Sequence, residues 1–150
     1  MTKSEIINNF VTSKKLALAG LSRDPKSFSR MVFKDMKQKG FEVLPINPNS
    51  GIIDETYCYK TINDIPEGTE NLLIMTAKAN TDEILKSAIN RGFKNIWIQQ
   101  GSETKNSELI ASDLKFTNLI TKQCIFMFNN PSGIHKFHRG INKLFGLIPK

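Results

Sequence analysis

Three features that would mark a membrane, secreted or redox protein are missing from this sequence. No apolar run approaches the roughly 18 residues that a membrane-spanning helix needs, and the first ten residues contain no secretory apolar segment. Only two cysteines are present, Cys58 and Cys124, and neither has a second thiol near it in sequence, which excludes a CxxC redox pair and a four-cysteine zinc site. We therefore expect reduced thiols, no membrane contact and a cytoplasmic location.

Acidic residues are also scarce. The chain has 14 Asp and Glu against 21 Lys and Arg, a net charge of +7, and no acidic residue follows Asp113. Such an excess of positive charge attracts anions. The basic residues are scattered from Lys3 to Lys150, without the Arg-rich blocks or stacking aromatic series that RNA-binding sheets display. We expect no nucleic-acid partner and a small anionic ligand instead.

The order of apolar and polar residues predicts a single domain over 1–150. Residues 1–10 predict a first helix, and short runs rich in branched residues then alternate with stretches of helical spacing. Gly40 and Gly92 each follow a helical stretch, where glycine forms a left-handed stop at the lowest cost. This alternation predicts the α/β class, a doubly wound, Rossmann-like parallel sheet in three α/β/α layers. The predicted strands span 15–20, 41–46, 71–75, 95–98 and 118–121, and Trp97 is expected in the core.

Two segments depart from this alternation. Residues 50–68 predict a loop, a short edge strand near 59–61, and one turn of helix that Asp64 caps. The chain ends in a predicted basic helix over 132–147, with an apolar stripe on one face and histidine, lysine and arginine on the other. Core packing or a subunit contact would explain that stripe, so a homodimer is one expectation.

Topology alone places a ligand in the loops that follow the predicted strands, at the point where strand order reverses. The first of these loops lacks the G-x-G-x-x-G signature of dinucleotide-binding proteins, because only Gly20 is present and Ser22 stands where the second glycine would be. The second strand runs into Asn47 and Pro48 instead of an acidic residue. Since an amide can donate to a ribose phosphate that a carboxylate would repel, the pattern favours NADP or coenzyme A over NAD.

The glycine turn and the charged side chains after it predict a phosphate site. Gly20 lets the backbone come close to a ligand, and the helix that follows would aim its unpaired main-chain N–H groups at an anion. Arg23 carries a planar fork of donors that can meet a phosphate in two hydrogen bonds, although it could instead pair with Asp24. Lys26 opens a predicted helix, where a positive charge opposes the helix dipole unless an anion is nearby. Ser22 is not expected to be a nucleophile, because a G-x-S-x-G elbow is absent.

Four segments, in this order along the chain, resemble the stand-alone CoA-binding domain family. They are Gly-Leu-Ser-Arg-x-Pro at 20–25, Gly-Phe-Glu-Val-Leu-Pro-Ile-Asn-Pro at 40–48, Tyr-Lys-Thr-Ile-Asn-Asp-Ile-Pro at 59–66, and Ile-Trp-Ile-Gln-Gln-Gly at 96–101. These small bacterial proteins are similar to the nucleotide-binding part of the succinyl-CoA synthetase α subunit, and the resemblance covers roughly residues 12–125. It implies a Rossmann-like fold that binds coenzyme A or an acyl-CoA. One departure is Thr-Ala-Lys-Ala at 76–79, where relatives often have a proline pair. The implied cofactor-binding residues are Gly20, Ser22, Arg23, Ser27, Asn47, Pro48, Thr76, Ala77, Gln99 and Gly101, and the charge argument above adds Lys26.

Cys124, His135 and His138 are the remaining candidates for chemistry. The histidines are three apart on one helix face and could share a thiol or metal, but no Asp or Glu in the tail completes a ligand set. We therefore expect no metal and no catalytic residue, and predict a non-catalytic binding or regulatory module for a nucleotide cofactor. The alternatives are an NADP-linked reductase, an acyl-CoA-handling enzyme that uses Cys124 and a histidine, and a fold that serves only for assembly.

Overall fold

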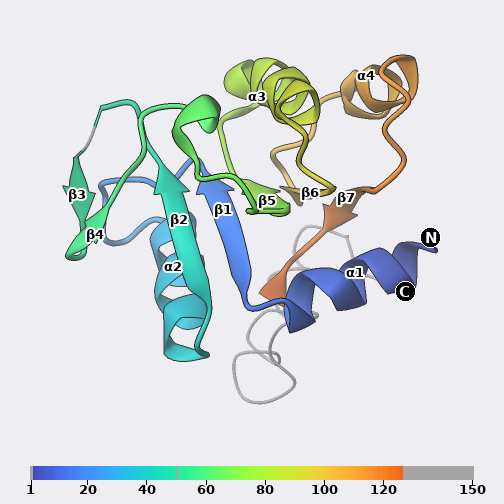
Figure 1. The fold of residues 1–150 in the computed structure, drawn as a ribbon. Coiled ribbons are helices and arrows are strands. Elements are labelled where there is room, and N and C mark those ends of the chain that lie inside the picture. Colours follow the sequence, from blue (N-terminus) through green and yellow to red (C-terminus); the bar gives the residue numbers. More distant parts are fainter. Residues whose placement is uncertain (1, 50, 127–150) are drawn as a thin grey trace.

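One parallel sheet of five strands organises residues 2–49 and 51–126, which are the residues that this computed structural model describes (Figure 1). The strand order reverses at the strand Lys15–Ala19. The next strand in the chain, Glu42–Ile46, pairs with one of its edges, and Asn71–Ile74 pairs with the other. All five predicted strands are confirmed to within two residues at each end. In sheet order they are β2 (Glu42–Ile46), β1 (Lys15–Ala19), β5 (Asn71–Ile74), β6 (Asn95–Gln99) and β7 (Leu119–Gln123).

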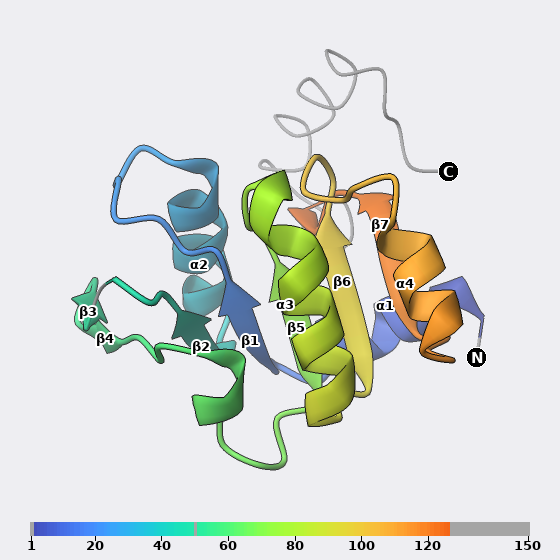
Figure 2. The same ribbon diagram turned by 90° about the horizontal axis from the view of Figure 1, so that it is seen from above.

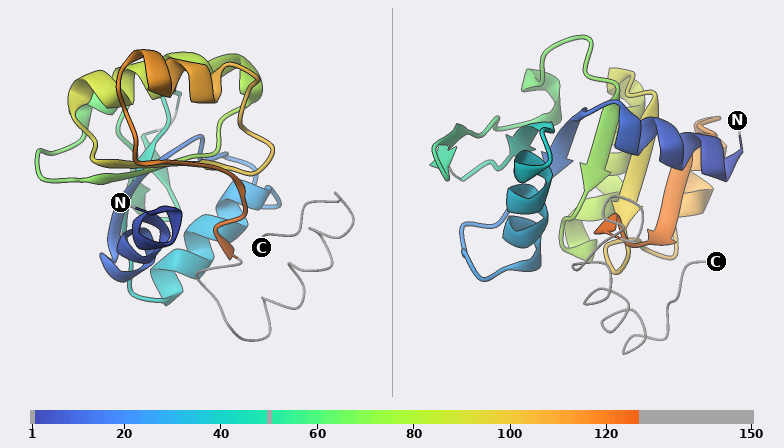
Figure 3. Two further views of the ribbon diagram at one scale, coloured as in Figure 1. Left: turned by 90° about the vertical axis from the view of Figure 1, so that its right-hand side faces the viewer. Right: turned by 90° about the horizontal axis from the view of Figure 1, so that it is seen from below.

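Two pairs of helices cover the two faces of the sheet, which confirms the predicted three-layer fold (Figures 2 and 3). Helices α1 (Lys3–Thr12) and α2 (Phe28–Gln38) pack on one face, and α3 (Lys78–Arg91) and α4 (Ser107–Asp113) on the other. Successive residues of a strand point to opposite faces, so alternate side chains of β1 enter two separate cores. None of the described helices is long and apolar enough to cross a membrane.

The segment between β2 and β5 differs from the prediction. An antiparallel hairpin of β3 (Ile52–Ile53) and β4 (Thr56–Tyr57) turns at Asp54 and Glu55, whose φ angles are +48° and +63°. The predicted edge strand near 59–61 is wrong, since only Tyr59 bridges to Ile46 at the sheet edge. The predicted helical turn is confirmed as a 3-10 turn, η1 (Ile62–Asp64). Its cap is also confirmed, because the Asp64 carboxylate accepts from the Thr61 N–H at 3.2 Å.

A ladder of three asparagines, of which Asn71 and Asn95 are buried, joins the amino ends of the strands, at the edge of the sheet opposite the predicted ligand loops. Asn95 donates to the Asn71 side-chain oxygen at 2.9 Å, and Asn118 donates to the Asn95 oxygen at 3.3 Å. Asn71 in turn donates to the Ser13 hydroxyl at 2.7 Å. Each asparagine therefore satisfies its neighbour in a part of the sheet where unpaired polar groups would be costly. The predicted basic helix over 132–147 lies outside the described residues.

Candidate functional site

A cavity of about 460 Å³ opens at the carboxyl ends of β1, β2 and β5, where the strand order reverses. Open α/β sheets bind their ligands at this position, and the volume falls within the roughly 300–1,000 Å³ of small-molecule sites. Two other cavities of about 440 and 510 Å³ lie at the outer edge of β7 and beside the hairpin, away from these strand ends. Five of the predicted residues line the cavity at the strand ends: Gly20, Asn47, Pro48, Thr76 and Ala77.

Gly20 allows the ends of β1 and β5 to approach each other. Its φ is +97°, and a Cβ atom added there would lie 2.5 Å from the Met75 carbonyl carbon and 2.6 Å from the Thr76 nitrogen. Directly before it, the Met75 N–H donates to the Ala19 oxygen at 2.7 Å. Both the positive φ and the close backbone approach require glycine, so this residue shapes the inner wall of the cavity.

Asn47 joins two of the loops that border the cavity. Its side-chain nitrogen donates to the Leu21 carbonyl at 2.8 Å, and its oxygen accepts from the Asn49 N–H at 2.8 Å. One of the two amide hydrogens is thus committed to the loop after β1, which leaves the other for a ligand. Asn47 has a structural role that the sequence alone did not reveal.

The loop between β1 and α2 satisfies many of its own donors, so it offers fewer main-chain N–H groups to an anion than the sequence suggests. Ser27 begins the helix as predicted, because its hydroxyl accepts from the Arg30 N–H at 3.3 Å. Four earlier N–H groups are already bonded: Ser22 to Ser29 Oγ at 2.9 Å, Asp24 to Ser22 Oγ at 3.0 Å, Lys26 to Asp24 Oδ1 at 2.9 Å, and Ser27 to the Asp24 carbonyl at 3.0 Å.

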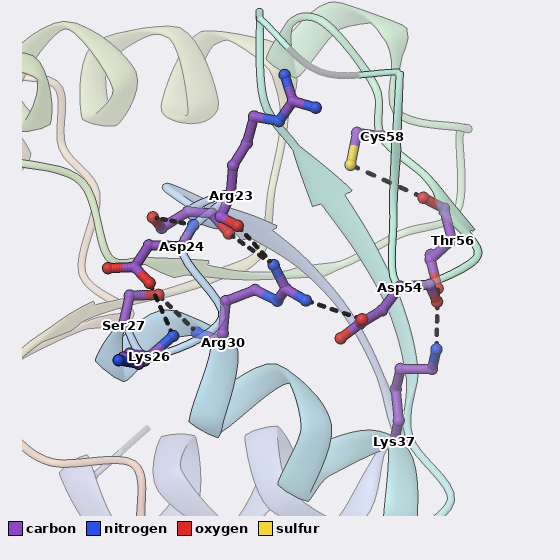
Figure 4. A network of polar contacts seen from close by, with 10 residues as sticks. Arg23, Asp24, Lys26, Ser27, Arg30, Lys37, Asp54, Thr56 and Cys58 are labelled. Carbon is purple, nitrogen blue, oxygen red and sulfur yellow. Dashed lines mark hydrogen bonds and ion pairs between the residues drawn. The ribbon is translucent and has the colours of Figure 1, made fainter.

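Arg23 and Lys26 supply the positive charge of this loop. Both side chains are exposed and lie beyond the residues that line the cavity. Neither forms an ion pair with another residue in the ranges 2–49 and 51–126, so the alternative pairing of Arg23 with Asp24 is not observed (Figure 4). An anion at the start of α2 would therefore meet two unpaired cations and the positive end of the helix dipole.

Arg30 of α2 contacts both the loop between β1 and α2 and the hairpin of β3 and β4 (Figure 4). Its guanidinium donates to the Arg23 carbonyl at 3.0 Å and forms an ion pair with Asp54 at 2.8 Å. The Arg30 side chain is only 11% exposed, whereas that of Asp54 is 49% exposed. Lys37 of α2 donates to the Thr56 hydroxyl at 2.9 Å, which is a second link between this helix and the hairpin. The hairpin that the sequence did not predict thus helps to position the residues beside the candidate phosphate site.

We expect Asp54→Ala to lower the free energy of unfolding by about 1–2 kcal/mol more than Glu55→Ala, because it leaves the buried Arg30 guanidinium without its counter-charge. Urea unfolding followed by circular dichroism measures the difference. Glu55 is a matched control, since it lies in the same turn with a similar positive φ and forms no ion pair with a described residue. Equal losses in the two variants would contradict the role given to the ion pair.

The loops after β5 and β6 are joined by hydroxyl groups. Thr76 Oγ1 lies 2.8 Å from Thr81 Oγ1, which donates to the Ser102 carbonyl at 2.8 Å. Two predicted residues of the β6 loop do not line the cavity. Gln99 is buried and its side-chain oxygen accepts from the Ile125 N–H at 3.0 Å, while the Gly101 N–H donates to the Glu103 carboxylate at 3.1 Å.

Helix α3 contributes a wall of the cavity that sequence analysis missed. Asn80, Glu83 and Ile84 line it, and they are separated by three and four positions, which places them on one face of the helix. The helical spacing was visible in the sequence, but which face borders the cavity depends on how α3 packs on the sheet.

The described cysteines are both in the interior. Cys124 is 1% exposed and packs in the core between the sheet and helices α1 and α2, so its thiol does not open to the cavity. Cys58 is equally buried, and burial raises the pKa of its thiol. Residues 2–49 and 51–126 contain no group of three His, Cys, Asp or Glu side chains that could hold a metal. His135 and His138 fall outside these ranges.

Comparisons with known proteins find relatives of this chain in sequence and in fold. The chain is 25% identical over 155 residues to the α subunit of ADP-forming acetate–CoA ligase II from Pyrococcus furiosus, a match that covers 97% of this chain but 32% of the relative. The uncharacterized protein YneT of Bacillus subtilis is 29% identical over 103 residues, which is 67% of this chain and 74% of that protein. The structure of a conserved hypothetical protein from Pyrococcus furiosus superposes with a TM-score of 0.71 at 29% identity, over 75% of this chain and 97% of that one.

The chain therefore spans about a third of the length of the ligase subunit that it resembles. The sequence model of the CoA binding domain family matches residues 14–130, a range that contains the whole sheet and every residue described above as lining the cavity. On that match, the chain belongs to the CoA binding domain family.

Proposed function

We propose that this protein binds coenzyme A or an acyl-CoA in the cavity at the carboxyl ends of β1, β2 and β5. The observation that carries the proposal is a cavity at the switch point of the sheet in a chain that belongs to the CoA binding domain family. The family match covers residues 14–130, and the cavity lies within that range at the switch point of the sheet. The relative from Pyrococcus furiosus is named as a subunit of an acetate–CoA ligase, which supports coenzyme A over NADP as the ligand.

The distribution of charge suggests how the ligand lies. Apart from the carboxylate of Glu83, the residues that line the cavity are neutral, with apolar side chains such as Ile46 and Ile84 and amides such as Asn47. This lining suits a nucleoside better than a phosphate. The exposed cations Arg23 and Lys26 lie outside the cavity at the start of α2, where they can meet the diphosphate.

A binding or regulatory role is proposed rather than catalysis. The Ser22 hydroxyl accepts from the Asp24 N–H, so it caps a turn. The thiol of Cys124 is enclosed in the core, and Cys124 does not line the cavity. The described residues thus offer a place to hold a cofactor, while the chemistry of an acyl transfer would have to come from elsewhere.

Isothermal titration with coenzyme A tests the proposal, and we expect Arg23→Ala to weaken binding by about tenfold, because a charge-assisted contact to the diphosphate is lost. Lys3→Ala is the control, since it removes one exposed positive charge from α1, near the opposite edge of the sheet (Figure 1). Absence of coenzyme A binding by the unmodified protein would overturn the proposed function. Equal effects of the two substitutions would overturn the placement of the diphosphate.

A further inference from the structure

The cavity contains one charged side chain, and it is an acid. Among the described residues that line it, Glu83 of α3 is the only one with a formal charge, while Asn47, Asn49, Asn80 and Thr76 supply neutral polar groups. A negative charge is unexpected in a site for a polyanion, because it repels every phosphate that comes near. Either the carboxylate lies there at a cost to binding, or it contacts a part of the ligand that is not a phosphate.

The local contacts of Glu83 distinguish it from its neighbour in sequence. The carboxylate of Asp82 accepts from the Thr104 hydroxyl at 2.5 Å and from the Asn106 amide at 3.5 Å, so it organises the loop after β6. Glu83 is exposed, and its carboxylate forms no hydrogen bond or ion pair with another residue in the described ranges. Its acceptor oxygens are available at the cavity wall, whereas those of Asp82 are already used.

We propose that Glu83 is a specificity-determining residue that accepts a hydrogen bond from an uncharged donor of the bound nucleoside, the exocyclic amine of the base. The inference rests on the proposed binding of coenzyme A and adds an orientation to it. The base and sugar lie in the cavity against α3, and the phosphates lie toward Arg23 and Lys26, where the charge is positive.

This arrangement is also compatible with the end of β2, where Asn47 stands in place of an acidic residue. An acidic residue at the end of β2 holds the ribose hydroxyls in many dinucleotide-binding sheets, but here that position is Asn47, whose amide is tied to the Leu21 carbonyl. Glu83 brings a carboxylate to the same cavity from helix α3. The carboxylate thus comes from the helix and not from the end of the strand, where it would repel a ribose phosphate.

The proposal and electrostatic repulsion alone predict opposite effects of Glu83→Ala on the affinity for coenzyme A. If Glu83 only repels the ligand, then Glu83→Ala removes a negative charge near a polyanion and tightens binding. If Glu83 accepts a hydrogen bond from the nucleoside, the same substitution weakens binding by about tenfold, since a hydrogen bond to a charged group is lost. Glu83→Gln keeps an oxygen acceptor without the charge and should retain affinity to within about threefold.

The experiment is calorimetric titration of the full chain and its variants with coenzyme A and with an analogue whose adenine carries oxygen in place of the 6-amino group. Glu67→Ala is the matched control, because Glu67 is an exposed acid without an ion pair in the described residues, at the amino end of β5. Thermal unfolding of each variant confirms that it is folded. Alanine is the best helix former, so Glu83→Ala is expected to leave α3 intact.

Four results are distinguishable. A loss for Glu83→Ala that is confined to coenzyme A supports the inference, because only coenzyme A carries the 6-amino group, whereas an equal loss with both ligands overturns it. An unchanged or tighter affinity of Glu83→Ala for coenzyme A, relative to Glu67→Ala, overturns the inference while leaving the proposed function intact. If the unmodified protein binds neither ligand, the proposed function itself fails and this inference falls with it.

Discussion

Gly20→Ala is expected to lower the free energy of unfolding by about 3 kcal/mol, through overpacking against the neighbouring strand together with an unfavourable φ. The added methyl group would lie 2.5 to 2.6 Å from the Met75 carbonyl and the Thr76 nitrogen. These are main-chain atoms, so a rotamer change cannot relieve the contact. The ends of β1 and β5 would have to separate, which would also stretch the 2.7 Å hydrogen bond between the Met75 N–H and the Ala19 oxygen.

Gly68→Ala separates the two causes. Gly68 has a φ of +89°, close to the +97° of Gly20, but a Cβ atom there would have no atom within 4 Å. It should therefore cost only the strain of a left-handed alanine, about 1 kcal/mol. Urea midpoints for both variants give the difference directly. If the two alanines destabilise the protein equally, the close approach of β1 to β5 is not what requires glycine at position 20.

The same substitution also tests the site. Since Gly20, Thr76 and Ala77 all line the cavity, separation of the two strand ends changes its inner wall. A Gly20→Ala protein that remains folded should bind coenzyme A more weakly than the Gly68→Ala protein, because only the former alters the cavity.

The sheet could be predicted from sequence because its strands are short, apolar and separated by clear helix stops. The stop at Gly92 illustrates the physics: the residue adopts a φ of +99° directly after α3, a conformation that most other residues avoid. The hairpin of β3 and β4 carried no such signal. Two-residue turns of this kind normally use Asn-Gly or Asp-Gly, and here the turn is Asp54 and Glu55, held by the tertiary ion pair with Arg30.

The candidate site was predictable at the strand ends and much less so elsewhere. Gly20, Asn47 and Thr76 follow strands, so the parallel topology alone brings them to one edge. Gln99 also ends a strand, but its side chain points into the interior to meet Ile125, because alternate strand residues face opposite sides. Glu83 is on a helix, and only the packing of that helix determines that it faces the cavity.

The motif after β1 predicts where the loop lies, but it does not show which main-chain donors of the loop are free. The order of glycine, serine and arginine suggested a row of free main-chain donors. In the structure, Ser22 and Asp24 fold back to accept from N–H groups of the loop itself. Short polar side chains compete with ligands for backbone donors, and sequence alone does not show which partner they choose. The role of the loop in anion binding therefore shifts toward Arg23 and Lys26.

The other large effect is expected from Trp97→Ala, which should lower the free energy of unfolding by about 3–5 kcal/mol. Trp97 is the only tryptophan and is fully buried, as the sequence predicts. It lies in β6, and its ring meets that of Phe10 of α1 edge to face, with centroids 5.5 Å apart. Its Nε1 donates to the Gln123 carbonyl of β7 at 3.0 Å. Truncation would leave a void between α1 and the sheet that the surrounding strands cannot close.

Trp97→Phe distinguishes ring packing from the hydrogen bond. It keeps an aromatic ring beside Phe10 but removes the N–H donor, and the Gln123 carbonyl retains the Gln100 N–H as a partner at 3.1 Å. Because no acceptor is left unsatisfied, the cost should be about 1–2 kcal/mol, well below that of alanine. Circular dichroism must follow the unfolding, since both variants lose the fluorescent indole. Equal losses in the two variants would assign the stability to the hydrogen bond and contradict the dominance of ring packing.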